Sequence, residues 1–105
     1  MRGNMGALLK QAQRVQENIK RLQVELGQLE VEGQSSSGLV KVTMTCKHNL
    51  KSVKLDPSLM EEDVDMVDDL IFMAVKDALD KVETTTKEKM AQATAGMPLP
   101  PGMMF

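Results

Sequence analysis

Residues 39–57 read LVKVTMTCKHNLKSVKLDP, and this stretch decides the fold. Apolar and polar residues alternate on both sides of a central CKHN, which is typical of two half-buried antiparallel strands joined by a tight turn. Asn49 is expected to make that turn, because asparagine tolerates a positive φ. One set of alternating side chains is predicted to face the core: Val40, Val42, Met44, Cys46, Val53 and Leu55.

Four lysines lie along the same stretch, at positions 41, 47, 51 and 54. The alternation turns Lys41, Lys47 and Lys54 toward solvent, whereas Lys51 falls on the buried side at a strand end from which it reaches water. Lysines on a small sheet commonly prevent aggregation between strand edges, and this interpretation is favoured over contact with phosphates. Lys41, Lys47 and Lys54 are therefore only secondary candidates for binding nucleic acid.

A further strand precedes this pair. Leu29, Val31 and Gly33 alternate with Glu30 and Glu32, and the turn-forming residues QSSSG follow at positions 34–38. The three strands are predicted to form an antiparallel meander with one apolar face.

A long helix is predicted before the strands, over residues 5–29. Apolar residues recur there at alternating spacings of three and four, which is typical of a helix that packs along a partner helix. These seam residues are Met5, Leu8, Ala12, Val15, Ile19, Leu22, Leu26 and Leu29.

A second long helix is predicted after Asp56 and Pro57. Ser58 and Glu61 have the spacing of a capping box, and the acids that follow suit the positive end of the helix dipole. Apolar residues then continue at helical spacing until Gly96 and Pro98 end the pattern. Residues 1–96 are expected to form a single domain, and the Pro- and Met-rich residues 97–105 a flexible extended tail.

These elements predict an α+β protein, an α-β-β-β-α protomer with a small three-stranded meander and two long protruding helices. At 1.5 Å per residue the helices would be about 37 and 45 Å long, whereas strands of six to eight residues extend only about 20–27 Å. The helices must therefore overhang the sheet. Because the seam stays apolar over its whole length and the core is thin, the chain is expected to form a homodimer.

The formal net charge of −2 conceals a strongly bipolar chain. Residues 1–54 contain nine Lys or Arg and four Glu, for a net charge of +5, whereas residues 55–105 contain four Lys and eleven acids, for −7. A near-neutral average therefore hides local fields of opposite sign.

Composition argues against several classes of protein. Two Phe, with no Tyr or Trp, do not provide the aromatic platforms on which single-stranded nucleic acids stack. Cys46 and His48 are too few ligands for zinc, and no cofactor is expected. The acidic run from Glu61 to Asp69 lacks the glycine of a calcium loop. No nucleophile–base spacing or phosphate loop indicates an enzyme.

The sequence also predicts a cellular location. A single cysteine fits a reducing compartment, and neither a signal peptide nor a membrane-spanning segment is apparent. The cytoplasm is the expected location.

The basic helix ends are better candidates for binding nucleic acid than the sheet lysines, and the alternative is that they only form a solvated helix face. Lys10, Arg14 and Arg21 lie opposite the seam, and no acid precedes Glu17. If the two helices run antiparallel, the lysines near the end of the second helix should meet the free end of the first at one tip. A dimer would then carry two basic tips suited to phosphates. The candidate residues are Lys10, Arg14, Lys20, Arg21, Lys87 and Lys89.

With these features in view, the chain resembles the YbaB/EbfC family of bacterial nucleoid-associated proteins. The resemblance rests on five segments in order: LLKQAQRVQENIKRLQVEL, GLVKVTM, DPSLMEEDVDMVDDLI, AVKDAL and EKMAQATAGMPLPPGM. It implies an α-β-β-β-α homodimer whose protruding helices clasp duplex DNA in the nucleoid. The expected function is DNA binding with weak sequence specificity, which alters DNA conformation and affects gene expression. The alternative is an adaptor dimer that acts with replication or recombination proteins.

Overall fold

The computed structural model of the chain describes residues 2–94. Its elements follow in the order α1 (Arg2–Gln28), β1 (Glu30–Gln34), β2 (Val40–Thr45), β3 (Leu50–Leu55), the short 3₁₀ helix η1 (Pro57–Glu61) and α2 (Val64–Thr94). The α+β class and the α-β-β-β-α order predicted from the sequence are therefore confirmed. The molecule is long and narrow, with extents of 72, 19 and 18 Å along its principal axes.

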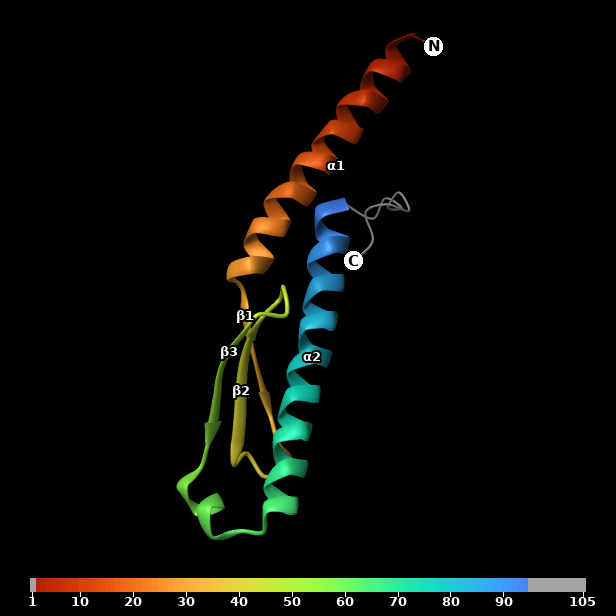
Figure 1. Cartoon of the computed structure of the whole chain (residues 1–105). Coiled ribbons are helices and arrows are strands. Elements are labelled where there is room, and N and C mark those ends of the chain that lie inside the picture. Colours follow the sequence, from red (N-terminus) through yellow and green to blue (C-terminus); the bar gives the residue numbers. More distant parts are fainter. Residues whose placement is uncertain (1, 95–105) are drawn as a thin grey trace.

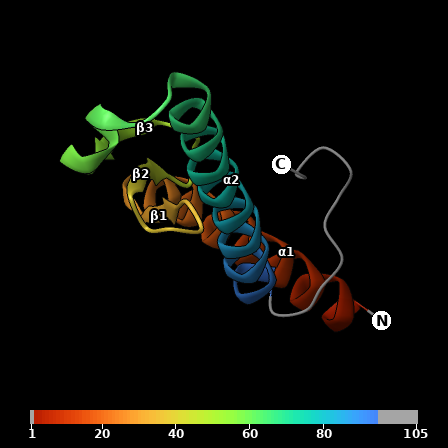
Figure 2. The same cartoon turned by 90° about the horizontal axis from the view of Figure 1, so that it is seen from below.

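The two long helices run antiparallel (Figure 1). α1 descends to the sheet, and α2 returns past the sheet and then along the lower part of α1. α1 extends well beyond the last turn of α2, as the view from below also shows (Figure 2). The molecule thus has two packing zones: α2 against β1 and β2, and α2 against α1.

The sheet is an antiparallel meander in the order β1-β2-β3. Gly33 of β1 pairs with Val42, and Val42 pairs on its other side with Val53 of β3. The pairing of β2 with β3 is interrupted by an irregularity between Thr43 and Met44. β2 is thus the central strand, and β1 and β3 are edges.

The β2–β3 turn differs from the sequence prediction in one detail. His48, not Asn49, adopts the positive φ, at 65°. Thr45 holds the turn: its hydroxyl accepts hydrogen bonds from the N–H groups of Lys47 and Asn49, at 3.3 and 3.2 Å. These bonds satisfy the hydroxyl of Thr45, which is buried and has almost no access to water.

The core between the sheet and α2 is built from small residues. Val40 and Val42 have no exposed surface, and neither do Ala74 and Ala78, one turn apart on α2. Gly33 faces this pair, and its missing side chain lets the helix backbone approach the strand. The four-residue spacing of buried positions on α2 follows the 3.6-residue period of a helix lying along a flat face.

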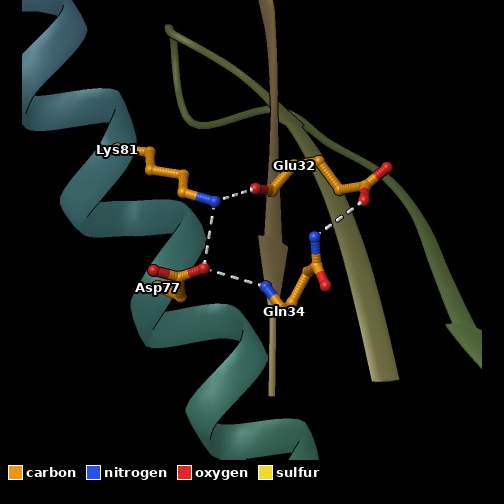
Figure 3. Close-up of polar contacts among 4 residues, drawn as sticks. All are labelled: Glu32, Gln34, Asp77 and Lys81. Atoms are coloured by element: carbon orange, nitrogen blue, oxygen red, sulfur yellow. Dashed lines mark hydrogen bonds and ion pairs between the residues drawn. The ribbon is translucent and has the colours of Figure 1, made fainter. Parts of the chain in front are cut away.

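Polar contacts tie β1 to α2 at the edge of this core (Figure 3). The Asp77 carboxylate accepts the backbone N–H of Gln34 at 2.9 Å and lies 3.2 Å from the ammonium group of Lys81. Lys81 in turn donates to the carbonyl oxygen of Glu32 at 2.7 Å. The hydrogen bond from the Gln34 N–H has the largest effect on the pKa of Asp77 and lowers it. Desolvation raises this pKa and Lys81 lowers it, so the pKa lies below its ordinary value.

A second apolar zone lies between the helices. Ile19, Leu22 and Leu26 of α1 are buried, as are Val82 and Met90 of α2. Near the described end of α2, the side-chain amide of Asn18 donates to the carbonyl oxygen of Ala93 at 3.3 Å. This bond satisfies one of the carbonyl groups that a helix leaves unpaired in its last turn.

The predicted seam is only partly buried. Met5 and Leu8 are 67% and 62% exposed, and Ala12 is also exposed. Val15 is the first seam residue to pack against the core. Within one protomer, α2 therefore covers only the lower part of the seam, because α1 projects beyond α2.

The sheet face is also only partly covered. Val53 and Leu55 were predicted to face inward but are 42% and 46% exposed. Their cross-strand partners Val42 and Val40 are fully buried. α2 covers β1 and β2 but does not reach across to the edge strand, so the prediction fails for β3 although the side chains share the expected face.

The start of α2 also differs from the prediction. Asp56 caps η1, with its carboxylate accepting the N–H of Ser58 at 2.9 Å, and this bond lowers the pKa of Asp56. α2 itself begins at Val64 and has only Asp65 in its first turn. The expected capping box of Ser58 and Glu61 is therefore wrong. The predicted helix end at Gly96 and Pro98, and the tail after it, lie outside the described residues.

Candidate nucleic-acid interface

The projecting half of α1 carries two exposed basic side chains among the site candidates. Lys10 and Arg14 are both exposed and lie one helical turn apart. Gln11, Gln13 and Gln16 around them are exposed as well. Because this half of α1 stands clear of α2 (Figure 1), a duplex could approach it without meeting the rest of the protomer.

Lys20 and Arg21 continue the basic surface toward the sheet, and both are exposed. Arg21 borders a shallow groove between α1 and α2, together with Glu25 of α1 and with Lys89 and Gln92 of α2. Both basic and acidic side chains line this groove. It is therefore a less favourable surface for phosphates than the projecting half of α1.

Lys87 and Lys89 do not meet Lys10 at one tip, contrary to the sequence prediction. The ammonium group of Lys89 lies 3.1 Å from the carboxylate of Glu25. Glu25 is about 22 Å from Lys10 along α1, at a rise of 1.5 Å per residue. The helices do run antiparallel, which is the condition on which that prediction rested, but α1 extends farther than α2.

Lys87 and Lys89 are both already paired. Lys87 lies 2.9 Å from Glu83 one turn earlier, and this contact lowers the pKa of the Glu83 carboxyl. Lys89 bridges the two helices through Glu25. A phosphate would have to compete with a carboxylate at each position. No local pattern indicates the Glu25–Lys89 pair, because 64 positions separate its members.

The sheet lysines lie apart from the helix ends. Lys41 and Lys54 are direct cross-strand neighbours, and both are exposed. Lys47 contacts the side-chain oxygen of Gln23 on α1. Like charges placed opposite one another on a sheet repel, so an anion bound between Lys41 and Lys54 would reduce the repulsion between them.

The acids gather at the other end of the molecule. η1 and the first half of α2 form the lower end in Figure 1, opposite the projecting half of α1. The exposed acids there are Glu61, Glu62, Asp63, Asp65, Asp68 and Asp69. The bipolar sequence thus becomes a molecule polarised along its long axis, which attracts a polyanion to the α1 end and repels it from the α2 start.

Other kinds of site find little support in residues 2–94. No three His, Cys, Asp or Glu side chains in that range come together as metal ligands. Cys46 is buried, which raises its pKa and disfavours the reactive thiolate. No helix in the same range is long and apolar enough to cross a membrane.

A small α+β domain with an exposed basic helix end and an acidic opposite end has the charge distribution of a polyanion-binding protein. The chain belongs to the YbaB/EbfC DNA-binding family, whose family model matches residues 1–97. The resemblance seen in the sequence is thereby confirmed. Membership makes the chain a bacterial nucleoid-associated DNA-binding protein, and DNA is its partner.

A solved structure shows the same fold. The uncharacterized protein HP0035 from Helicobacter pylori matches with a TM-score of 0.60 at 22% sequence identity. The match covers 70% of this chain and 86% of that one. At this identity the match supports the fold alone and does not indicate which residues contact DNA.

Proposed function

We propose that the protein is a cytoplasmic homodimer that clasps duplex DNA through the basic ends of α1, reads sequence weakly and alters the conformation of the bound DNA. The observation that carries this proposal is the projecting half of α1. It is exposed, bears Lys10 and Arg14, has no acid before Glu17 and lies opposite the acidic end. Changes in gene expression would follow from the altered DNA.

Phosphate contacts are expected to dominate. Lysine, arginine and glutamine side chains on a helix surface hydrogen-bond readily to phosphate oxygens, which fix orientation without reading bases. Lys10 and Arg14 are the primary contacts, with Lys20 and Arg21 continuing the same arm. Lys87, Lys89, Lys41, Lys47 and Lys54 are secondary contacts.

The apolar surface beside α2 supports a dimer. Val53 and Leu55 on β3 lie next to the buried face, and the partly buried Ile71 and Val75 of α2 border the same core. Asp77 contacts β1, so residues 71 and 75 lie on the side of α2 toward β3. β3 is also an unpaired edge strand. A second copy of the chain would cover this surface and remove the exposed edge.

Two protomers joined there by a twofold axis would present two α1 arms. Each arm would be a rigid helix of fixed direction, because its lower half is packed against α2 and the sheet. Two basic arms at a fixed separation would hold a duplex more strongly than one arm, since the second contact becomes intramolecular.

A salt-titrated binding assay on random duplex DNA tests the proposal, with the mass of the free protein measured in parallel. If Lys10 and Arg14 of two arms each contact one phosphate, the logarithm of the affinity should fall with the logarithm of the salt concentration, with a slope of about −3.6. A monomeric mass together with salt-independent binding would contradict both the dimer and the phosphate contacts.

A further inference from the structure

The exposed seam of α1 is continuous with a buried one. Met5, Leu8 and Ala12 lie on the same helical face as Ile19 and Leu22, which α2 covers. The covering ends at the described end of α2, where Asn18 bonds to Ala93. Val15 still packs against the core, so the uncovered stripe consists of Met5, Leu8 and Ala12 and lies beyond the part of α1 that α2 covers.

The sequence continues from that same point. Residues 95–105 read AGMPLPPGMMF and follow Thr94, which is itself buried at 3% exposure. The segment contains no charged residue, so covering an apolar surface would not strip water from a charge. Met97, Leu99 and Phe105 provide apolar side chains of the kind that fill irregular apolar surfaces.

The segment has the reach to cover the stripe. Met5 lies thirteen residues before Asn18, which is about 20 Å along a helix. Eleven residues in an extended, polyproline-like conformation span up to about 34 Å. Pro98, Pro100 and Pro101 exclude a continuing helix and favour that conformation, which costs less entropy to order than a flexible chain.

We infer that residues 95–105 bind back along α1 of the same chain and cover the stripe formed by Met5, Leu8 and Ala12. The segment takes over from α2 as the partner of α1 over its projecting half. It acts as a splint that keeps this arm helical and straight. Lys10 and Arg14 lie on other faces of α1, so the docked segment leaves them free.

Backbone hydrogen exchange of the full chain tests this inference. The variant replaces Met97, Leu99 and Phe105 by serine. Amides of residues 8–15 should then exchange about tenfold faster, because local opening of the arm becomes easier. Amides of residues 19–26, which α2 and the sheet cover, should not change. Equal exchange at residues 8–15 in both proteins would overturn the inference.

A matched pair of substitutions on α1 tests the same contact from the other side. Leu8→Glu places a charge in the stripe and should speed exchange at residues 8–15 as the serine variant does. Leu9→Glu is the control, since Leu9 is 63% exposed but turned about 100° from Leu8 around the helix. Equal acceleration by both substitutions would argue against a specific contact.

An NMR experiment distinguishes the chain's own segment from that of a second copy. Cross-relaxation between the Phe105 ring and the Leu8 methyl groups should appear in uniformly labelled protein. It should be absent between differently labelled chains in a mixture. Contacts seen only between chains would overturn the inference. DNA affinity is measured separately, so loss of the splint and loss of the proposed DNA contacts remain distinguishable.

Discussion

Gly33 of β1 lies so close to α2 that a β-carbon added to it would stand 2.7 Å from the Cβ of Ala78. The carbonyl oxygen of Ala74 would be closer still. This approach places the helix directly on the strand backbone, and the direction of α2 follows from it. Because α1 packs along α2 with Leu22 and Leu26 buried, the direction of the arm depends on the same contact.

Gly33→Ala should destabilise the protein by at least about 2 kcal/mol, since overpacking a tight contact between two backbones leaves no flexible side chain to move aside. Urea unfolding followed by circular dichroism measures the loss. Gly6→Ala is the control. No atom lies within 4 Å of a β-carbon at Gly6, so the helix should gain up to about 1 kcal/mol from the better propensity of alanine. Equal effects of the two substitutions would contradict the close contact.

Asp77→Ala should destabilise the fold at neutral pH by about 1 kcal/mol, because it removes the acceptor of the Gln34 N–H and the partner of Lys81. The folded pKa of Asp77 is below its ordinary value of 3.8. Its stabilisation is therefore fully present above that value and is lost as pH falls through the folded pKa. The difference between wild type and variant should shrink below about pH 4 in urea titrations.

A second ion pair on the same helix provides the comparison for Asp77. Glu83 and Lys87 are 2.9 Å apart, closer than Asp77 and Lys81, but both side chains are more than half exposed. Glu83→Ala should cost much less stability than Asp77→Ala, because water and salt screen an exposed ion pair. If Glu83→Ala cost as much as Asp77→Ala, the tether to β1 would not be the source of the effect.

Local pattern predicted the elements well. Alternation in residues 39–57 and the three–four spacing of the seam yielded the order α-β-β-β-α and the antiparallel meander. Both patterns encode which face of an element is apolar. They do not encode how far a partner extends over that face, which is why Leu8 and Val53 proved exposed.

The same contrast between local pattern and the alignment of elements applies to the candidate site. The exposure of Lys10 and Arg14 could be predicted from their place opposite the seam. The Glu25–Lys89 pair could not, since it depends on how α1 and α2 are aligned along their axes. That alignment is set by the sheet and by the close contact at Gly33, and it separated Lys89 from the tip.

The double substitution of Lys10 and Arg14 by glutamate should abolish DNA binding. Reversing two charges on each arm replaces attraction to phosphate by repulsion, and both side chains are exposed, so stability should change by less than about 0.5 kcal/mol. Electrophoretic mobility shifts on random duplexes measure binding. Lys41→Glu with Lys54→Glu is the matched control on the sheet and should weaken binding much less. An unchanged shift for the first pair would refute the arm model.

Val53→Glu should convert the proposed dimer to a monomer, because it would bury a charge in the interface beside β3. Sedimentation equilibrium measures the mass. Val24→Glu is the control: Val24 is 66% exposed on α1, away from the proposed interface, and its replacement should leave the mass unchanged. DNA affinity should fall with the loss of the second arm. A dimer that persists in Val53→Glu would assign the interface to another surface.

Glu25→Gln should strengthen DNA binding about three- to tenfold at low salt if Lys89 contacts phosphate, because the substitution releases an ammonium group now held at 3.1 Å by a carboxylate. The pair is partly exposed, at 35% for the side chain of Lys89 and 52% for that of Glu25, so its loss should change stability by at most about 1 kcal/mol. Fluorescence anisotropy at several salt concentrations measures both affinity and slope, and one added phosphate contact per arm should steepen the slope by about 0.9 for each contact. The same substitution in a Lys89→Gln background separates release of the lysine from a simple gain in net positive charge. An equal gain in that background would remove Lys89 from the DNA contacts and leave the interface to the projecting half of α1.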